Sequence, residues 1–147
     1  MSKKELLEQY KSMTEELPEL AAKISRLETG IRKLEQEEVT DSVSCGRHGK
    51  KPIRTVKIKG APVRDITLRK RRLQRRRLEY AMLSRKIEEQ TEEAEKIING
   101  IEDSELRRIL RMRYLHGMGW KEVAHLMGNG FTEDVCKKRV YRFFEKL

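Results

Sequence analysis

A heptad pattern of apolar residues in the first part of the chain constrains its fold more than any other feature. The spacing alternates between four and three residues through Leu6, Tyr10, Met13, Leu17, Leu20, Ile24, Leu27, Ile31 and Leu34. This spacing puts every one of these side chains on one stripe of an α-helix and predicts packing along a partner helix. Pro18 lies inside the run, and its missing N–H predicts a kink or a division near Leu17.

A second row of heptad-like positions follows, and it is apolar at eight of eleven places. Its members are Ile66, Arg69, Leu73, Arg76, Tyr80, Leu83, Ile87, Gln90, Ala94, Ile97 and Ile101. We expect two long amphipathic helices that fold back as an antiparallel, coiled-coil-like hairpin, on the order of 50 Å long at ~1.5 Å per residue. The same stripes could instead pair between two chains, so a homodimer is the alternative.

Residues 39–64 separate the two rows and are predicted to form a long basic connector. This segment contains Gly46, Gly49, Pro52, Gly60 and Pro62, and it holds seven basic residues against one acidic. Residues 55–59 alternate like a short strand, but they have no evident partner, so we expect a loop there too. The predicted domains are therefore a helical hairpin over 1–102, with its connector, and a separate unit over 103–147.

The unit at 103–147 is predicted to contain three short helices. Asp103 or Ser104 can cap the first helix and Thr132 the third, because their side-chain oxygens can accept from free backbone N–H groups. A small residue, Ala124, lets the third helix cross closely over the second. The expected buried positions are Leu106, Ile109, Leu110, Tyr114, Leu115, Trp120, Val123, Ala124, Met127, Cys136, Val140, Phe143 and Leu147.

Two stretches of this unit carry a family resemblance. Residues 117–128 read GMGWKEVAHLMG, and residues 132–142 read TEDVCKKRVYR. The first resembles the scaffold helix of region four of bacterial RNA polymerase sigma factors, especially the extracytoplasmic-function type. The second is similar to that family's Ser-Glu-Gly-Thr-Val-Lys-Ser-Arg-Leu-His-Arg. The turn between them departs from the family, because Asn129, Gly130 and Phe131 stand where one aliphatic residue is usual. Nothing upstream resembles region two, which opens promoter DNA.

The resemblance implies an all-α protein in which a sigma region four-like helix-turn-helix follows the hairpin, a layout similar to sigma-like regulators of bacterial prophages. It implies a transcriptional regulator that binds double-stranded DNA at promoters together with host RNA polymerase. By analogy with recognition helices, the residues facing the major groove would be Thr132, Glu133, Lys137, Lys138 and Tyr141, while Arg139 and Arg142 would hold phosphates. A phage DNA-packaging protein similar to a small terminase subunit is the alternative.

The charge of the chain also favours a polyanionic partner. Its formal net charge is +10, and clustered cations release condensed counterions from nucleic acid. Residues 68–78 contain seven basic residues and no acidic one. We interpret this run as a grip on phosphates through Arg71, Arg72, Arg75 and Arg76. The alternative is a solvated face balanced by the acidic residues of the first helix.

Several other classes of protein lack support in the sequence. No apolar run approaches the ~20 residues that a bilayer requires, and the start lacks a secretory apolar core, so we expect a cytoplasmic protein with no membrane contact. Cys45 and Cys136 stand too far apart to suggest a disulfide framework, and Cys45 with His48 is at most half a metal site. No catalytic or nucleotide-binding motif is present. We therefore expect no enzyme activity, cofactor or metal.

Overall fold

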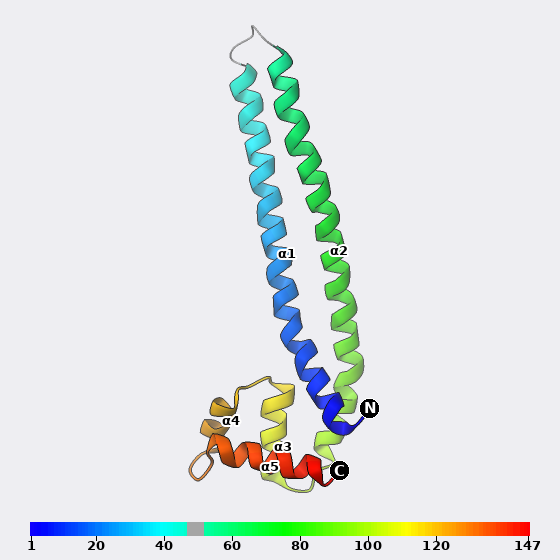
Figure 1. Ribbon diagram of the computed structural model, residues 1–147, viewed down its shortest axis with the longest axis vertical. Coiled ribbons are helices and arrows are strands. Elements are labelled where there is room, and N and C mark those ends of the chain that lie inside the picture. Colours follow the sequence, from blue (N-terminus) through cyan, green and yellow to red (C-terminus); the bar gives the residue numbers. More distant parts are fainter. Residues whose placement is uncertain (47–51) are drawn as a thin grey trace. The chain divides into compact units, whose positions relative to one another are not determined.

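The computed structural model describes the backbone of residues 1–46 and 52–147 and the side chains of residues 1–37 and 63–147. The protein is all-helical, with 86% of its residues in helices and no strand among the described residues, as predicted. Its elements in order are α1 (Lys3–Gly46), α2 (Pro52–Asn99), α3 (Ser104–Leu110), the π-helical turn η1 (Arg111–Leu115), α4 (Trp120–Met127) and α5 (Glu133–Glu145) (Figure 1).

The chain divides into two compact units. One combines Met1–Leu17 with Leu83–Leu147, and the other is Pro18–Met82. These bounds differ from the predicted segments 1–102 and 103–147. The reason is that the beginning of α1 and the end of α2 supply buried side chains to the same hydrophobic cluster as α3, α4 and α5.

In the unit Pro18–Met82, α1 and α2 pack through their predicted stripes. One cluster of buried side chains consists of Ile31, Ile66 and Leu73, with Ile24, Leu27 and Leu34 packed against them. Glu28 pairs with Arg77, and Glu35 pairs with Lys70. Residue numbers therefore rise along one helix as they fall along the other, which means that the two segments run antiparallel.

The helices extend further into the predicted connector than the sequence suggested. α1 continues to Gly46 and α2 already begins at Pro52, so the prediction of a loop was wrong for residues 39–46 and 52–64, including at 55–59. Proline is compatible with the first position of a helix, because the N–H group that it lacks would have no intrahelical partner there. Residues 47–51 lie outside the described backbone.

The predicted division near Leu17 is also absent, since α1 runs through Pro18 as one helix.

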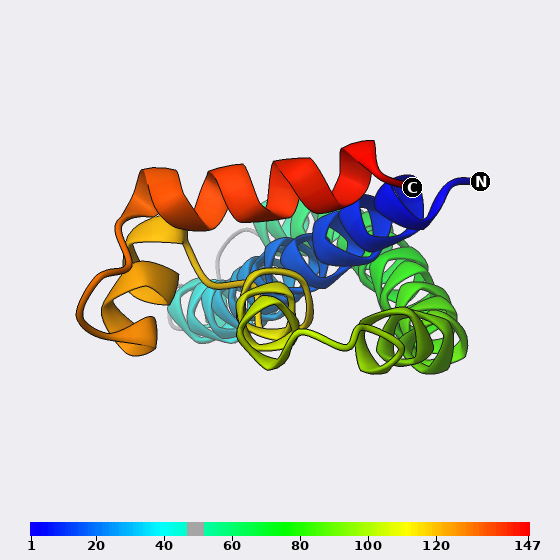
Figure 2. The ribbon, with the colours of Figure 1, turned by 90° about the horizontal axis from the view of Figure 1, so that it is seen from below.

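The core of the unit Met1–Leu17 with Leu83–Leu147 gathers around α3, η1, α4 and α5. Figure 2 shows α5 crossing over α3 and α4. Most predicted core positions are buried, including Leu106, Ile109, Leu110, Tyr114, Val123, Ala124, Met127, Cys136 and Val140. Leu147 is wrong as a core residue, because 59% of its surface is exposed.

The stripes of the long helices also shift slightly from the predicted positions. Leu7 and Ile98 are fully buried, although the predicted rows contained their neighbours Leu6 and Ile97, and Tyr80 is exposed. An ideal α-helix drifts by about 20° per heptad against a strict seven-residue repeat. This drift moves the buried position from Ile97 to Ile98 near the end of α2, whereas Leu7 is buried because it belongs to the cluster formed with α3, α4 and α5.

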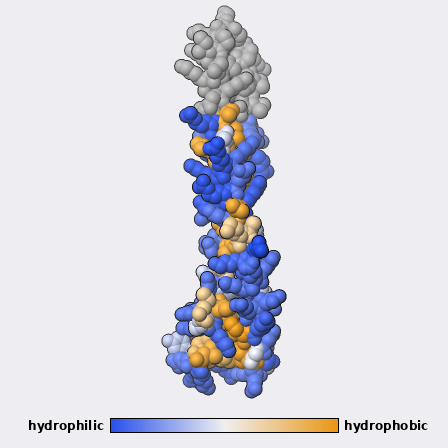
Figure 3. Space-filling view, turned by 90° about the vertical axis from the view of Figure 1, so that its right-hand side faces the viewer, coloured by the Kyte–Doolittle hydropathy of each residue, from blue (hydrophilic) through white to orange (hydrophobic). Residues whose placement is uncertain are grey.

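The described surface is mostly polar. On the face drawn in Figure 3, hydrophilic surface predominates and apolar surface is confined to separate patches. Among the described residues, no helix combines the length and the apolar character needed to cross a membrane.

Candidate nucleic-acid interface

Helix α5 carries most of the residues predicted to contact DNA. Thr132 precedes it as the N-cap, and its Oγ1 accepts a hydrogen bond from the Val135 backbone N–H at 3.3 Å. Cys136 and Val140 are buried at 0% and 3% exposure and anchor one face of the helix in the core. The predicted contact residues Thr132, Glu133, Lys137, Lys138, Tyr141 and Arg142 are all exposed. The helix is therefore held by one face while its cations and Tyr141 remain accessible.

Arg139 differs from the other predicted contact residues of α5. Its guanidinium donates to the Glu105 carboxylate of α3 at 2.5 Å and lies 5.3 Å from the centre of the Phe131 ring. Its side chain is only 38% exposed. Arg139 therefore links α5 to α3 and to the preceding turn. The prediction that it holds a phosphate would require it to give up this carboxylate.

The turn before α5 contains Asn129, Gly130 and Phe131, the segment expected from the sequence to be longer than in the sigma family. Gly128 and Gly130 have φ angles of +92° and +90°, a conformation that side chains with a Cβ rarely adopt. The Phe131 N–H donates to the Gly128 carbonyl at 3.3 Å, and the Phe131 ring packs against the core. The longer turn therefore folds back on itself and anchors an aromatic ring beneath Arg139.

The beginning of α1 lies beside α5 and forms a cleft of about 400 Å³ with it. The Lys4 ammonium lies 5.6 Å from the Tyr141 ring centre and 6.0 Å from that of Phe144, distances typical of cation–π contacts. The lining combines four cations, two carboxylates and four aromatic rings: Lys4, Lys11, Arg113, Lys137, Glu8, Glu15, Tyr114, Trp120, Tyr141 and Phe144. One side of the predicted recognition helix is thus flanked by α1.

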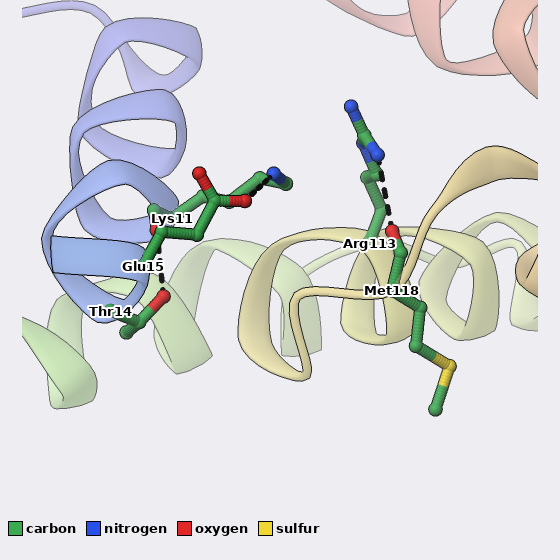
Figure 4. Close-up of polar contacts among 5 residues, drawn as sticks. All are labelled: Lys11, Thr14, Glu15, Arg113 and Met118. Atoms are coloured by element: carbon green, nitrogen blue, oxygen red, sulfur yellow. Dashed lines mark hydrogen bonds and ion pairs between the residues drawn. The ribbon is translucent and has the colours of Figure 1, made fainter. Parts of the chain in front are cut away.

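Arg113, which lines this cleft, is held in place by two contacts. Its Nη1 donates to the Met118 carbonyl at 3.1 Å, and its guanidinium stacks 4.6 Å from the centre of the Trp120 ring. Figure 4 shows the hydrogen bond to Met118 and, on α1, the ion pair between Lys11 and Glu15. Arg113 lies in the π-helical turn η1, a type of bulge that is frequent at functional sites. The start of α4 is therefore braced by a cation of the preceding helix.

The second predicted contact region, the basic run of α2, lies in the unit Pro18–Met82. Arg71, Arg72 and Arg75 are exposed, whereas Arg76 is half-buried and donates to Glu79 at 2.9 Å. Within the same run, Lys70 and Arg77 form ion pairs with carboxylates of α1. Some cations of the run are therefore paired with carboxylates, whereas Arg71, Arg72 and Arg75 form no ion pair among the described side chains.

No known family, curated protein or solved structure matches this chain.

Burial perturbs two titratable groups of the unit that contains α5. Desolvation raises the pKa of Tyr114, with a smaller contribution from the nearby Glu8 carboxylate. Desolvation likewise raises the pKa of the Cys136 thiol, against a smaller lowering effect of Arg139. The Cys136 thiol is therefore held in its neutral form and serves as a core residue.

The structure groups no metal ligands among the side chains that it describes. No three His, Cys, Asp or Glu side chains of residues 1–37 and 63–147 lie together as a metal ion would require. His116 and His125 are exposed, with His116 at the end of η1. Cys45 and His48, the half-site considered from the sequence, lie outside the described side chains.

Some residues around α5 carried no signal in the sequence. Lys4 belongs to a mixed-charge start, and nothing in its neighbourhood indicates that it lies over the Tyr141 ring near the other end of the chain. Arg113 similarly looked like one more cation of an amphipathic helix. The contacts of both residues depend on how helices pack, and a single sequence does not encode this as a local pattern.

Proposed function

We propose that this protein is a sequence-specific, double-stranded DNA-binding transcriptional regulator of phage or prophage origin. In this proposal α3, α4 and α5 form a sigma region four-like helix-turn-helix, with α5 in the major groove, and α1 with α2 forms a helical hairpin. One observation carries it: α5 is anchored by Cys136 and Val140, while Lys137, Lys138, Tyr141 and Arg142 are all exposed. Recognition helices of this class present their exposed side chains to base edges and phosphates in the same way.

Base-edge contacts fit the chemistry of these exposed side chains. Lysine donates to the acceptor atoms of guanine in the major groove, and a carboxylate such as Glu133 can accept from the amino group of cytosine. The positive end of the α5 dipole, at Thr132, also favours a nearby phosphate. Arg142 is well placed for a phosphate, because it is exposed and forms no ion pair with a carboxylate among the described side chains.

Sequence-specific binding is tested by selection from a randomised duplex library followed by gel-shift titration. The variant Lys137→Ala with Lys138→Ala should lose specific binding to the selected duplex. A matched control, Lys86→Ala with Lys96→Ala, removes two exposed lysines of α2 and should retain it. Unchanged affinity of the α5 variant, or no enriched sequence at all, would contradict the proposal.

We further propose that the regulator acts with a host RNA polymerase that already carries a sigma factor. The resemblance in this sequence extends to region four and not to the strand-opening region two, so promoter melting would come from the resident holoenzyme. In a purified transcription assay, the protein should raise transcript from a promoter containing the selected site only when a host sigma factor is present. Initiation with core polymerase alone would identify a complete sigma factor. Ring-shaped oligomers that bind only a packaging site would favour the DNA-packaging alternative.

A further inference from the structure

The unit Pro18–Met82 has a cleft of about 240 Å³ that is lined almost entirely by cations. Lys23 and Arg26 contribute from α1, and Arg72, Arg75 and Arg76 contribute from α2, with Leu27 as the only other lining residue. Liquid water occupies about 30 Å³ per molecule, so this volume accommodates a phosphate group with several waters. Two helices thus meet with cations on both sides of one groove.

These cations lack the partners that their neighbours have. Among the described side chains, Lys23, Arg26, Arg72 and Arg75 form no ion pair, and only Arg76 does, with Glu79 on its own helix. Like charges that face each other at short range repel and destabilise the arrangement that holds them. A bound polyanion would remove that repulsion.

Another cleft of the same helix pair shows the opposite arrangement. It contains Glu28, Arg77 and Lys70, and the Glu28 carboxylate accepts from Arg77 at 2.8 Å. Lys70 reaches Glu35 at 3.3 Å. Both α2 cations of this cleft are therefore paired with carboxylates of α1, although its lining also includes Arg32 of α1. The cationic cleft is lined by no carboxylate. General solvation of a charged helix pair does not explain this asymmetry.

We propose that the cleft of Lys23, Arg26, Arg72, Arg75 and Arg76 binds the phosphodiester backbone of duplex DNA. This inference rests on the proposed function and adds Lys23 and Arg26 of α1 to the contact residues. Guanidinium groups suit phosphate because their planar forks can donate two parallel hydrogen bonds. The lining contains no aromatic ring, so it offers no stacking platform for the exposed bases of a single strand. Its contribution to affinity is independent of sequence.

The test measures how the affinity of the full chain for a non-selected duplex depends on salt. The variant Lys23→Gln with Arg26→Gln should lower the log–log salt slope by roughly 0.9 for each phosphate that is no longer neutralised. The control Lys70→Gln with Arg77→Gln removes the same charge from the ion-paired cations and should change the slope much less. Lys23→Arg with Arg26→Lys preserves the charge and should retain the original slope.

Each outcome of this experiment decides the inference. Equal slope changes in the two Gln variants would show a bulk charge effect and overturn it, as would an unchanged slope in the α1 variant. Loss of binding to phosphatidylserine vesicles with unaltered duplex binding would assign the cleft to a membrane surface instead. If the unaltered protein binds no duplex, both this inference and the proposed function fail. If specific binding persists with an unchanged slope, only the inference fails.

Discussion

The Arg139 guanidinium donates to the Glu105 carboxylate at 2.5 Å and joins α5 to α3. Both side chains are partly exposed, at 38% and 51%, so solvent screens the pair and its contribution is on the order of 0.2–1 kcal/mol. We expect a double-mutant cycle of Arg139→Ala and Glu105→Ala, measured by urea unfolding, to give a coupling energy in this range. No measurable coupling would show that the pair does not stabilise the fold.

Variants around Arg139 should separate residues that stabilise α5 from residues that bind DNA. Lys138→Ala, one position earlier on an exposed face, should leave the free energy of unfolding nearly unchanged and weaken DNA binding. Glu105→Ala leaves the arginine free and should not weaken DNA binding. Weaker binding in Glu105→Ala, without loss of stability, would contradict this separation.

Thr132 caps α5, and this contact predicts a measurable effect on stability. Thr132→Ala removes the acceptor for the Val135 N–H and should lower the free energy of unfolding by about 1 kcal/mol. Thr132→Ser keeps the hydroxyl and should keep most of that stability. Thermal and urea unfolding of both variants provide the measurement. A Thr132→Ala protein as stable as the original would mean that the cap contributes nothing.

Gln90 introduces an unsatisfied polar group into the apolar stripe of α2. Its Oε1 is buried and has no hydrogen-bond partner among the described residues, and leaving such a group unpaired costs roughly 1–3 kcal/mol. Gln90→Leu should therefore raise the free energy of unfolding, by about 1 kcal/mol at the lower end of that range. Gln74→Leu, at an exposed position of the same helix, is the control and should change it little. Destabilisation by Gln90→Leu would show that the amide makes an interaction that the apolar side chain cannot replace.

The raised pKa of Tyr114 predicts a loss of stability at alkaline pH. Burial favours the neutral phenol in the folded state, whereas the unfolded chain titrates near its ordinary pKa of about 10. The stability that the raised pKa of Tyr114 contributes is fully present below the unfolded pKa of about 10. It is lost as the pH rises through the higher pKa of the folded state, because the unfolded chain releases its phenol proton first. Unfolding curves across this range should be less pH-dependent for Tyr114→Phe. An identical pH profile would contradict the assignment.

Local patterns predicted much of the fold because each depends on neighbours within a few turns. The heptad spacing identified Ile31 and Leu73 as packing positions, and residue type and position identified Thr132 as a cap. The limits of α1 and α2 were not predicted, because glycine and proline weaken a helix without always ending it. The sequence likewise indicated an exposed, cationic α5.

Contacts between segments that are distant in the chain could not be predicted from local sequence patterns. Arg139 was predicted to hold a phosphate, because its carboxylate partner, Glu105, is 34 positions away in the chain and leaves no local signal. Lys23 and Arg26 similarly resembled ordinary solvated charges, and their significance depends on the register in which α1 meets α2. Heptad spacing predicts which stripe is buried, but it does not decide which flanking charges face each other across the pair.

The unit containing α5 is discontinuous along the chain, and this affects the order in which it can form during synthesis. Tyr10 contacts Thr91 81 positions later, and Leu7 belongs to the same cluster as Val140. At roughly 5–20 residues per second, a ribosome needs about 4–16 s to make the segment that separates Tyr10 from Thr91. Throughout that interval Leu7 and Tyr10 of nascent α1 lack the later residues of their cluster, from Ala94 to Val140, which leaves both side chains accessible to chaperones. A ribosome stalled at residue 90 would therefore carry a chain still exposing Leu7.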